Sequence, residues 1–520
     1  SQDMPTDRLV KASMSQARTL ACLHHPGVLY PIGLGTVTVE EAGRSVGWLQ
    51  AGMVWTLFER CSGGSLRAGA ATGWPALRDL CLDLLDVLAL AHSREVIHGN
   101  LHPGNVWQAT DQDTRPGLKL SDFLLGQVEE LGDHRGLPMG SHACYLAPEV
   151  CEARWRDVGP ETDLYSLGCL AWTLATGKEL FREYQTGPAI RQAQVEVNLP
   201  GFRPVVETPP GFGGWMSLML RKDPKERFGQ AADARDALLN LDKTRVRGSV
   251  VRSVATMPAD CGEPEGVEHP ELLAAGLGLY GLREVPLVDR DAQRAEIWDA
   301  MLRVRRAARS EAILIHGPAG HGKSRLTEWM VRRAWQRGAA EVIKAVHDTG
   351  VGPTVGLGPM LARYYRVVGL DREKTKERLR QRLTAEGVTD DYEWEALTEM
   401  FHPSPKGREI VRFEQTSERY SLIRRALERA ARRRPVILWV EDVPWGHDAL
   451  EFIVDLLDGQ RLASFPVLVV MTARDEALPQ QPREAMMLKE MLNRPDCSRI
   501  TVGTLAPGDH RKLIAQALLV

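Results

Sequence analysis

A glycine-rich segment at residues 317–324 has the residue types and spacing needed to hold phosphate groups. It reads G-P-A-G-H-G-K-S, with glycines at Gly317, Gly320 and Gly322. Glycines let backbone N–H groups close around phosphate oxygens, and a helix that starts here adds unpaired N–H donors. Lys323 would reach the β- and γ-phosphates, and the Ser324 hydroxyl would bind Mg²⁺. The segment therefore predicts a nucleotide site with magnesium.

Two apolar runs end in polar residues that could complete this site. Residues 436–440 lead directly to Glu441 and Asp442, and residues 467–471 lead to Arg474. At the carboxyl ends of parallel strands, one acid can orient Mg²⁺ and the other can polarise water. The pattern leaves open which acid does which. Arg474 could sense the γ-phosphate, although a surface arginine after a strand is an equally good interpretation.

Alternating helices and buried strands must position these side chains. The hydrophobic pattern predicts a helix over 291–309, a strand over 312–316 and a helix over 324–337, before the two strands just described. Residues 349–405 read as mostly helical. Strands that alternate with helices predict an α/β domain with a mainly parallel, doubly wound sheet.

Three segments of this half resemble the signal-transduction ATPases with numerous domains, a branch of the AAA-related P-loop proteins: 313–324, 439–445 and 470–474. The resemblance covers residues 279–520, and its helical lid would only begin near residue 505. It implies an ATP-dependent switch in which the first acid, Glu441, takes the place of the usual aspartate as magnesium ligand. Asp442 would then position the attacking water, with Lys323 holding the phosphates.

A second series of motifs lies within residues 1–241, in a fixed order along the chain. Its members are H-G-N-L-H-P-G-N at 98–105, S-D-F at 121–123, A-P-E at 147–149 and K-D-P-K-E-R at 222–227. Together they resemble the motifs of Ser/Thr protein kinases. The resemblance implies an α+β kinase-like fold with a helical large lobe. It also implies Mg²⁺ ligands at Asn105 and Asp122, and a buried ion pair between Glu149 and Arg227.

The catalytic chemistry of this kinase-like segment is altered. Asn100 occupies the position of the catalytic base, and an amide cannot accept a hydroxyl proton as a carboxylate does. His102 replaces the lysine that contacts the transferred phosphate, and Leu124 replaces the glycine after the metal-binding Asp-Phe pair. These substitutions favour a pseudokinase that acts by docking.

The small lobe is incomplete as the sequence stands. A helix over 9–23 resembles its regulatory helix, but Gln16 replaces the expected glutamate, and about eight residues before it are too few for a glycine-rich loop and three strands. Either the chain is truncated or the lobe is degenerate. Residues 242–278 are polar and rich in turn residues, which predicts a linker before the domain at 279–520.

Composition and charge restrict the cellular compartment and the kinds of partner that we expect for this protein. The formal net charge is −3, the eight cysteines are scattered, and no apolar run reaches the roughly 18 residues of a membrane span. Six arginines between 424 and 434 are interrupted by Glu428, so a solvated helix face is preferred over a nucleic-acid site. These features predict a cytoplasmic protein without a membrane span, and nucleic acid is not indicated.

The combined interpretation is a bacterial signal-transduction protein that binds ATP and Mg²⁺, with unidentified protein partners and a nucleotide-dependent oligomer left open. The P-loop domain would hydrolyse ATP and regulate, or be regulated by, the impaired kinase-like domain. One alternative is an active Ser/Thr kinase with a regulatory ATPase domain. Another is a nucleotide-gated scaffold that binds nucleotide without turning it over.

Overall fold

The computed structural model describes residues 19–20, 22–45, 49–67, 73–123, 142–241, 287–348, 355–405 and 411–518. Several predictions fall outside these ranges: most of the helix over 9–23 with Gln16, the substitution at Leu124, and the linker over 242–278.

The N-terminal half begins with two small antiparallel sheets. β1 (Pro31–Thr36) pairs with β2 (Val54–Phe58), and the short helix α2 (Val39–Arg44) lies between them in sequence. β3 (Gly64–Ser65), β4 (Val106–Ala109) and β5 (Gly117–Leu120) form a three-stranded sheet. The loop before β4 and the segment after β5 carry the kinase-like motifs, so this sheet brings them together.

Helices form the rest of this half. They are α3 (Trp74–Ser93), α4 (Pro148–Cys151), α5 (Pro160–Thr176), α6 (Gly187–Glu196), α7 (Phe212–Met219) and α8 (Ala231–Leu239). Pro160 stands at the start of α5, where its missing N–H is not needed, and Gly177 ends the helix in the left-handed conformation. Fourteen of the 17 residues of α5 are buried. It is therefore the central helix on which the neighbouring loops can be anchored.

The C-terminal half is built on one parallel sheet, which confirms the predicted strand arrangement. Its strands are β6 (Glu311–Gly317), β7 (Glu341–Val346), β8 (Val436–Glu441), β9 (Val467–Arg474) and β10 (Cys497–Thr501), in the order β10-β6-β9-β8-β7. β6 lies between β10 and β9, so the glycine-rich segment after β6 is flanked by the ends of two other strands.

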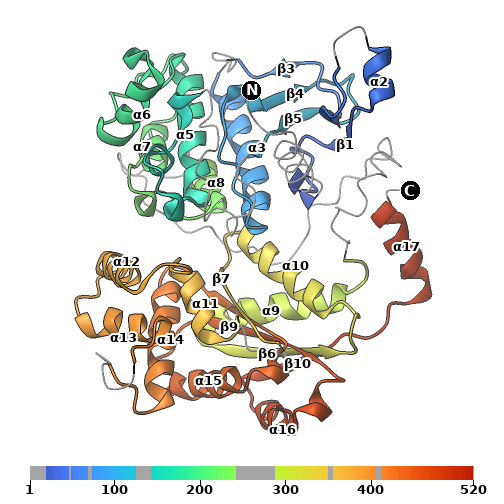
Figure 1. The fold of residues 1–520 in the computed structure, drawn as a ribbon, viewed down its shortest axis with the longest axis vertical. Coiled ribbons are helices and arrows are strands. Elements are labelled where there is room, and N and C mark those ends of the chain that lie inside the picture. The colour runs from blue at the N-terminus through green and yellow to red at the C-terminus, as the bar shows by residue number, and fades with distance from the viewer. Residues whose placement is uncertain are drawn as a thin grey trace.

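Helices cover both faces of this sheet (Figure 1). One face packs against α9 (Asp291–Ala307) and α10 (Lys323–Gln336) through side chains such as Ile313 and Ile315. The alternate residues, such as Leu314, face the other core. That core holds α11 (Leu357–Tyr364), α12 (Arg372–Ala385), α13 (Asp391–Phe401), α14 (Thr416–Ala431), α15 (His447–Asp458) and α16 (Pro482–Met491). The final helix is α17 (Pro507–Leu518).

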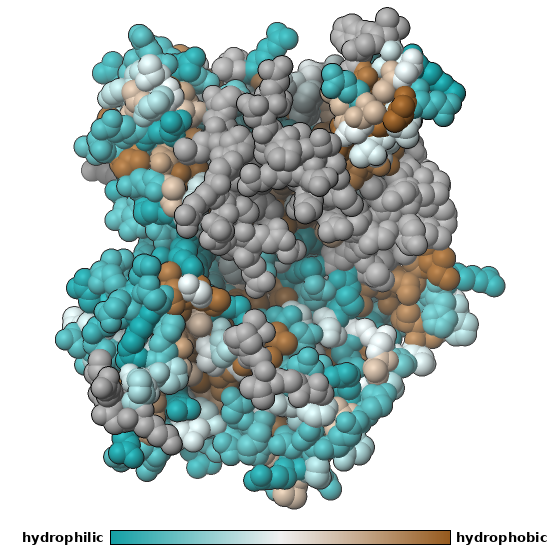
Figure 2. Space-filling model, in the orientation of Figure 1, coloured by the Kyte–Doolittle hydropathy of each residue, from teal (hydrophilic) through white to brown (hydrophobic). Residues whose placement is uncertain are grey.

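The two halves contact each other, and Figure 1 shows the lower end of α3 meeting α10. The visible surface over α12 and α13 is mostly hydrophilic in Figure 2, as expected for helices that bury only one side. Within the described residues, no helix is both long and apolar enough to cross a membrane.

Candidate functional sites and their relatives

Backbone conformation shapes the loop between β6 and α10. Gly317, Gly320 and Gly322 have φ values of 154°, 76° and 93°, which side chains rarely tolerate. A Cβ on Gly317 would also lie 2.2 Å from the carbonyl oxygen of Val502. The glycines are therefore required by the path of the chain, and the loop delivers its last residues to the N-terminus of α10 at Lys323.

Lys323 is folded back over this loop. Its Nζ donates to the carbonyl oxygens of Gly317 at 2.9 Å and Pro318 at 2.7 Å, and the side chain is only 6% exposed. Burial lowers the pKa of its ammonium group, while nearby carboxylates, led by Asp442, oppose that effect. Ser324, by contrast, is exposed. The loop thus presents a cation held in place and a hydroxyl open to solvent.

The structure brings Asp442 and Arg474 together beside Lys323. The Asp442 backbone N–H donates to Thr472 Oγ1 at 3.0 Å, and Arg474 Nη2 lies 3.2 Å from Asp442 Oδ2. Burial raises the pKa of Asp442, although Arg474 lowers it. Thr472 had no assigned role in the sequence, but its place two residues before Arg474 on β9 could have indicated one.

Glu441 has a different environment from its neighbour. Its carboxylate pairs with Lys344 Nζ at 2.8 Å, and that ammonium group also lies 3.8 Å from the centre of the Trp439 ring. Lys344 belongs to β7, on the side of β8 away from the glycine-rich loop. Of the two acids, Asp442 is therefore the one electrostatically coupled to Lys323.

Sequence reasoning missed Glu476. Both of its carboxylate oxygens lie 3.2 Å from the backbone N of Ala319, within the glycine-rich loop. The residue before it, Asp475, donates its backbone N–H to Gly317 O at 3.2 Å. Glu476 follows β9 by two residues, so its position at the strand's carboxyl end was the available signal.

The kinase-like loop of the N-terminal half is anchored to α5. Asp163 is fully buried, and its carboxylate accepts from the backbone N–H groups of His98 and Gly99, each at 2.8 Å, and contacts His92 Nε2. The His98 ring lies 4.5 Å from the Phe123 ring, centre to centre. These contacts connect the loop to the segment after β5.

Asn100, Asn105 and Asp122 are brought into one region. Asn105 Nδ2 donates to Asn100 O at 2.9 Å, and the backbone N–H of Ser121 donates to Asn105 O at 3.0 Å. Asp122 has a φ of 57°, an unusual conformation for a residue with a side chain. Asn105 therefore adjoins the altered base position, and Ser121, the residue before Asp122, is bonded to Asn105.

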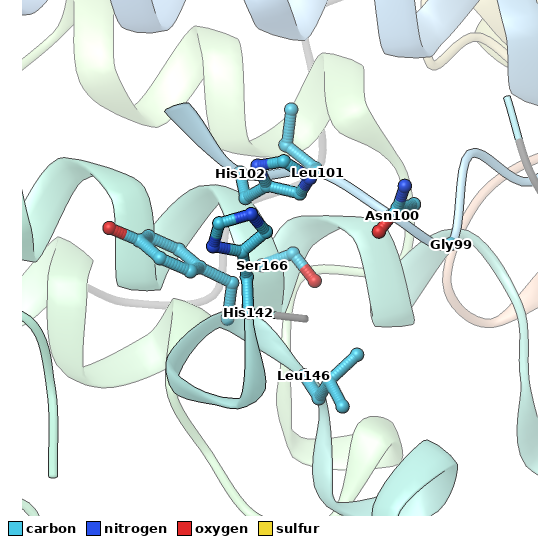
Figure 3. A pocket seen from close by; sticks show the side chains of 8 residues that line it. Gly99, Asn100, Leu101, His102, His142, Leu146 and Ser166 are labelled. Carbon is cyan, nitrogen blue, oxygen red and sulfur yellow. The ribbon is translucent and has the colours of Figure 1, made fainter. Parts of the chain in front are cut away.

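His102 lines a small pocket together with Asn100 and His142 (Figure 3). The rings of His102 and His142 are 3.8 Å apart, centre to centre, and His102 Nδ1 accepts from the Gly104 backbone N–H at 3.1 Å. Burial, followed by repulsion from His142, lowers the pKa of His102 to about 4. The side chain at the lysine position is therefore neutral at pH 7.

The ion pair implied by the kinase resemblance is confirmed. Arg227 Nη1 and Nη2 donate to the two carboxylate oxygens of Glu149 at 2.8 and 2.9 Å, and both side chains are fully buried. Thr162, near the start of α5, also donates to Glu149. The pair therefore ties α4 to the central helix and to the segment before α8.

Comparison with known proteins agrees with both sets of motifs. Residues 47–238 match the protein kinase domain family, and residues 286–470 match the AAA ATPase domain family. The chain joins a protein kinase domain to an AAA ATPase domain. Both predicted resemblances, to kinases and to AAA-type ATPases, are thereby confirmed.

The curated relatives resemble the kinase domain. Serine/threonine-protein kinase PknA of Mycobacterium tuberculosis is 27% identical over 232 residues, which are 43% of this chain and 49% of that protein. Serine/threonine-protein kinase Pkn1 of Myxococcus xanthus is 27% identical over 210 residues, 38% and 29% of the two chains. Calcium-dependent protein kinase 1 of Oryza sativa is 30% identical over 190 residues, 34% of each. The chain thus spans half or less of the length of these relatives.

Buried and partly buried polar contacts join the kinase domain to the AAA domain. Arg434 Nη2 lies 2.6 Å from Asp233 Oδ2, and these side chains are 7% and 4% exposed. Gln230 donates to Ala340 O at 3.3 Å, and Arg378 of α12 contacts Asp157 Oδ1 at 3.2 Å. The predicted solvated arginine face is therefore wrong for Arg434, because the kinase domain covers it.

The helix α10 connects the two functional regions. It begins at Lys323 of the glycine-rich loop, and Gln336 at its other end lies 3.4 Å from Ser93 Oγ at the end of α3. The kinase catalytic loop follows α3 within a few residues. One helix therefore runs from the glycine-rich loop of the AAA domain to the helix that leads into the kinase loop.

Proposed function

We propose that the AAA domain binds Mg²⁺-ATP and hydrolyses it as a signalling switch. The observation that carries this proposal is the cluster of Lys323, Asp442 and Arg474 around a glycine-rich loop whose three glycines have positive φ values. Lys323 and Arg474 supply positive charge for the β- and γ-phosphates. An ATP-dependent switch of the numerous-domain type is the function that this arrangement supports best.

The residues present fit a magnesium ion. Mg²⁺ prefers hard oxygen ligands, and the exposed Ser324 hydroxyl and the Asp442 carboxylate are of this type. Glu441 remains the second candidate ligand, and it would have to release Lys344 first. Bound magnesium would neutralise charge on the phosphates, while the carboxylate that does not bind it orients water for attack.

We propose that the kinase domain contributes through docking and is catalytically impaired. Two observations support this: an amide at Asn100 in place of the base, and a neutral, buried His102 in place of a cation. The contacts of Arg434 and Arg378 with the kinase domain supply the docking surface. Nucleotide binding at the P-loop and the state of the kinase domain would be coupled through α10.

An active Ser/Thr kinase is the second candidate function, and one observation favours it. The described contacts beside Asn105 and Asp122 would suit a kinase loop, because Asp163 holds the loop and the His98 and Phe123 rings are in contact. Mg²⁺-ATP binding at Asn105 and Asp122 is compatible with those contacts. In this alternative, the AAA domain would regulate phosphate transfer to proteins.

The cysteines and the relatives bear on the cellular location of the protein. The seven described cysteines are free, which fits a reducing compartment. Two of the relatives named above come from bacteria. We infer a bacterial cytoplasmic regulator whose signalling partners are proteins.

Phosphate release from ATP tests the proposal. Lys323→Ala should reduce release by about 100-fold or more, because the loop loses the cation for the β- and γ-phosphates. Lys374→Ala is the control, since that lysine is exposed on α12 and pairs with Asp371. Turnover that survives Lys323→Ala would show that the P-loop is not the site of hydrolysis.

A further inference from the structure

Glu476 makes a contact that ATP hydrolysis does not require. Its two carboxylate oxygens are each 3.2 Å from the backbone N of Ala319, the third residue of the phosphate-binding loop. Backbone N–H groups of such a loop are the donors that bind phosphate oxygens. A carboxylate of this chain is therefore bound to the loop in the way that an anionic ligand would be.

Neighbouring contacts fix the position of Glu476. The Asp475 backbone N–H donates to Gly317 O at 3.2 Å, and the Asp475 carboxylate is 2.9 Å from His316 Nδ1. The segment after β9 is thus attached to both the end of β6 and the start of the loop. Because the backbone and the side chain of Asp475 are both bonded to this region, the adjacent Glu476 lies next to Ala319.

The charge of Glu476 acts on the phosphate-binding cation. Backbone N–H groups, its own and then that of Ala319, lower the pKa of Glu476, so it is ionised at pH 7. Lys323 is attracted to it as well as to Asp442. A terminal phosphate drawn to Lys323 would bring additional negative charge close to this carboxylate. Because Glu476 is exposed, solvent and salt partly screen the repulsion, so it should be largest at low ionic strength.

We propose that Glu476 is a specificity-determining residue that makes the AAA site discriminate between nucleoside triphosphate and diphosphate. In this proposal the γ-phosphate of a triphosphate approaches the Ala319 N–H and competes with the Glu476 carboxylate for it, whereas a diphosphate has no γ-phosphate. This inference rests on the proposed nucleotide binding at the P-loop. The difference in binding free energy between the two nucleotides is attributed to Glu476.

Calorimetric titration of the full chain with ADP and with a non-hydrolysable imido analogue of ATP tests this role. Glu476→Gln should tighten binding of the ATP analogue by about fivefold or more and change ADP affinity by less than about twofold. Asp475→Asn is the charge-matched control, because its side chain contacts His316 instead of Ala319. Equal changes for both nucleotides, or an equal effect of Asp475→Asn, would overturn the proposal.

Lys323→Ala separates this inference from the function on which it rests. If Lys323→Ala binds ADP as tightly as the unmodified chain, the P-loop is not the nucleotide site and both proposals fail. If Lys323→Ala loses ADP binding while Glu476→Gln leaves the ratio of the two affinities unchanged, only the role of Glu476 is wrong. Glu476 is exposed, so its substitution should not impair folding, and a thermal unfolding curve checks this.

Discussion

The glycine-rich loop of the AAA domain and the loop of the kinase domain over residues 98–105 both lie beside a strand end and are both held by buried contacts. They differ in the charges that they present. The AAA loop places Lys323 among carboxylates and near Arg474, whereas the kinase loop offers an amide at Asn100 and a neutral imidazole at His102. Contacts that hold a loop in place therefore do not imply that its catalytic groups are present. The charged groups at each loop distinguish the two regions.

The kinase domain keeps the contacts that stabilise its fold. Arg227→Ala would leave the Glu149 carboxylate buried without its partner, and such losses cost about 3–5 kcal/mol. Chemical denaturation should show this decrease in the free energy of unfolding of the kinase domain. Arg44→Ala, which removes an exposed pair with Glu40, is the control and should have no measurable effect. Equal stability of the two variants would contradict a structural role for the Glu149–Arg227 pair.

Removing the charge of an acidic residue should change ATP hydrolysis differently at the two sites. Asp442→Asn should reduce ATP hydrolysis by about 100-fold, since its carboxylate orients magnesium or water. Asp122→Asn, the corresponding change in the kinase domain, should leave phosphate release unchanged. Steady-state phosphate assays on both variants make the comparison, and a larger loss in Asp122→Asn would place turnover in the kinase domain.

The contact between the domains offers a third comparison. Arg434→Ala should loosen docking and increase amide hydrogen exchange in α3 and the end of α10. A double-mutant cycle with Asp233→Ala should give a coupling energy of about 1–3 kcal/mol. Arg432→Ala is the control, because that side chain is 66% exposed. Unchanged exchange in Arg434→Ala would mean that this pair does not hold the domains together.

The smallest expected effect concerns pH. The raised pKa of Asp442 means that it takes up a proton at a higher pH than an ordinary aspartate, so ATP hydrolysis should fall early as pH decreases. Arg474 lowers that pKa, so Arg474→Ala should shift the acid limb of the normalised rate profile to higher pH. A rate profile that stays in place or moves to lower pH would show that Asp442 is not the group whose ionisation limits the rate.

The sequence predicted local features well. The glycine spacing of 317–324 depends on backbone geometry that a short segment determines by itself, and the parallel sheet follows from alternating patterns. The pairing of Arg434 with Asp233 was not predictable, because the residues are 201 positions apart and each lies in an ordinary polar segment. The same holds for the contact between the His102 and His142 rings, which depends on how the large lobe packs.

The central claim is that ATP turns over at the AAA loop and not at the kinase loop. Incubating the full chain with Mg²⁺ and γ-labelled ATP, and measuring free phosphate and labelled protein together, tests it directly. We predict free phosphate that is abolished by Lys323→Ala and unaffected by Asp122→Ala, with no labelled protein. Label on protein that disappears in Asp122→Ala would contradict the claim and establish a working kinase despite Asn100.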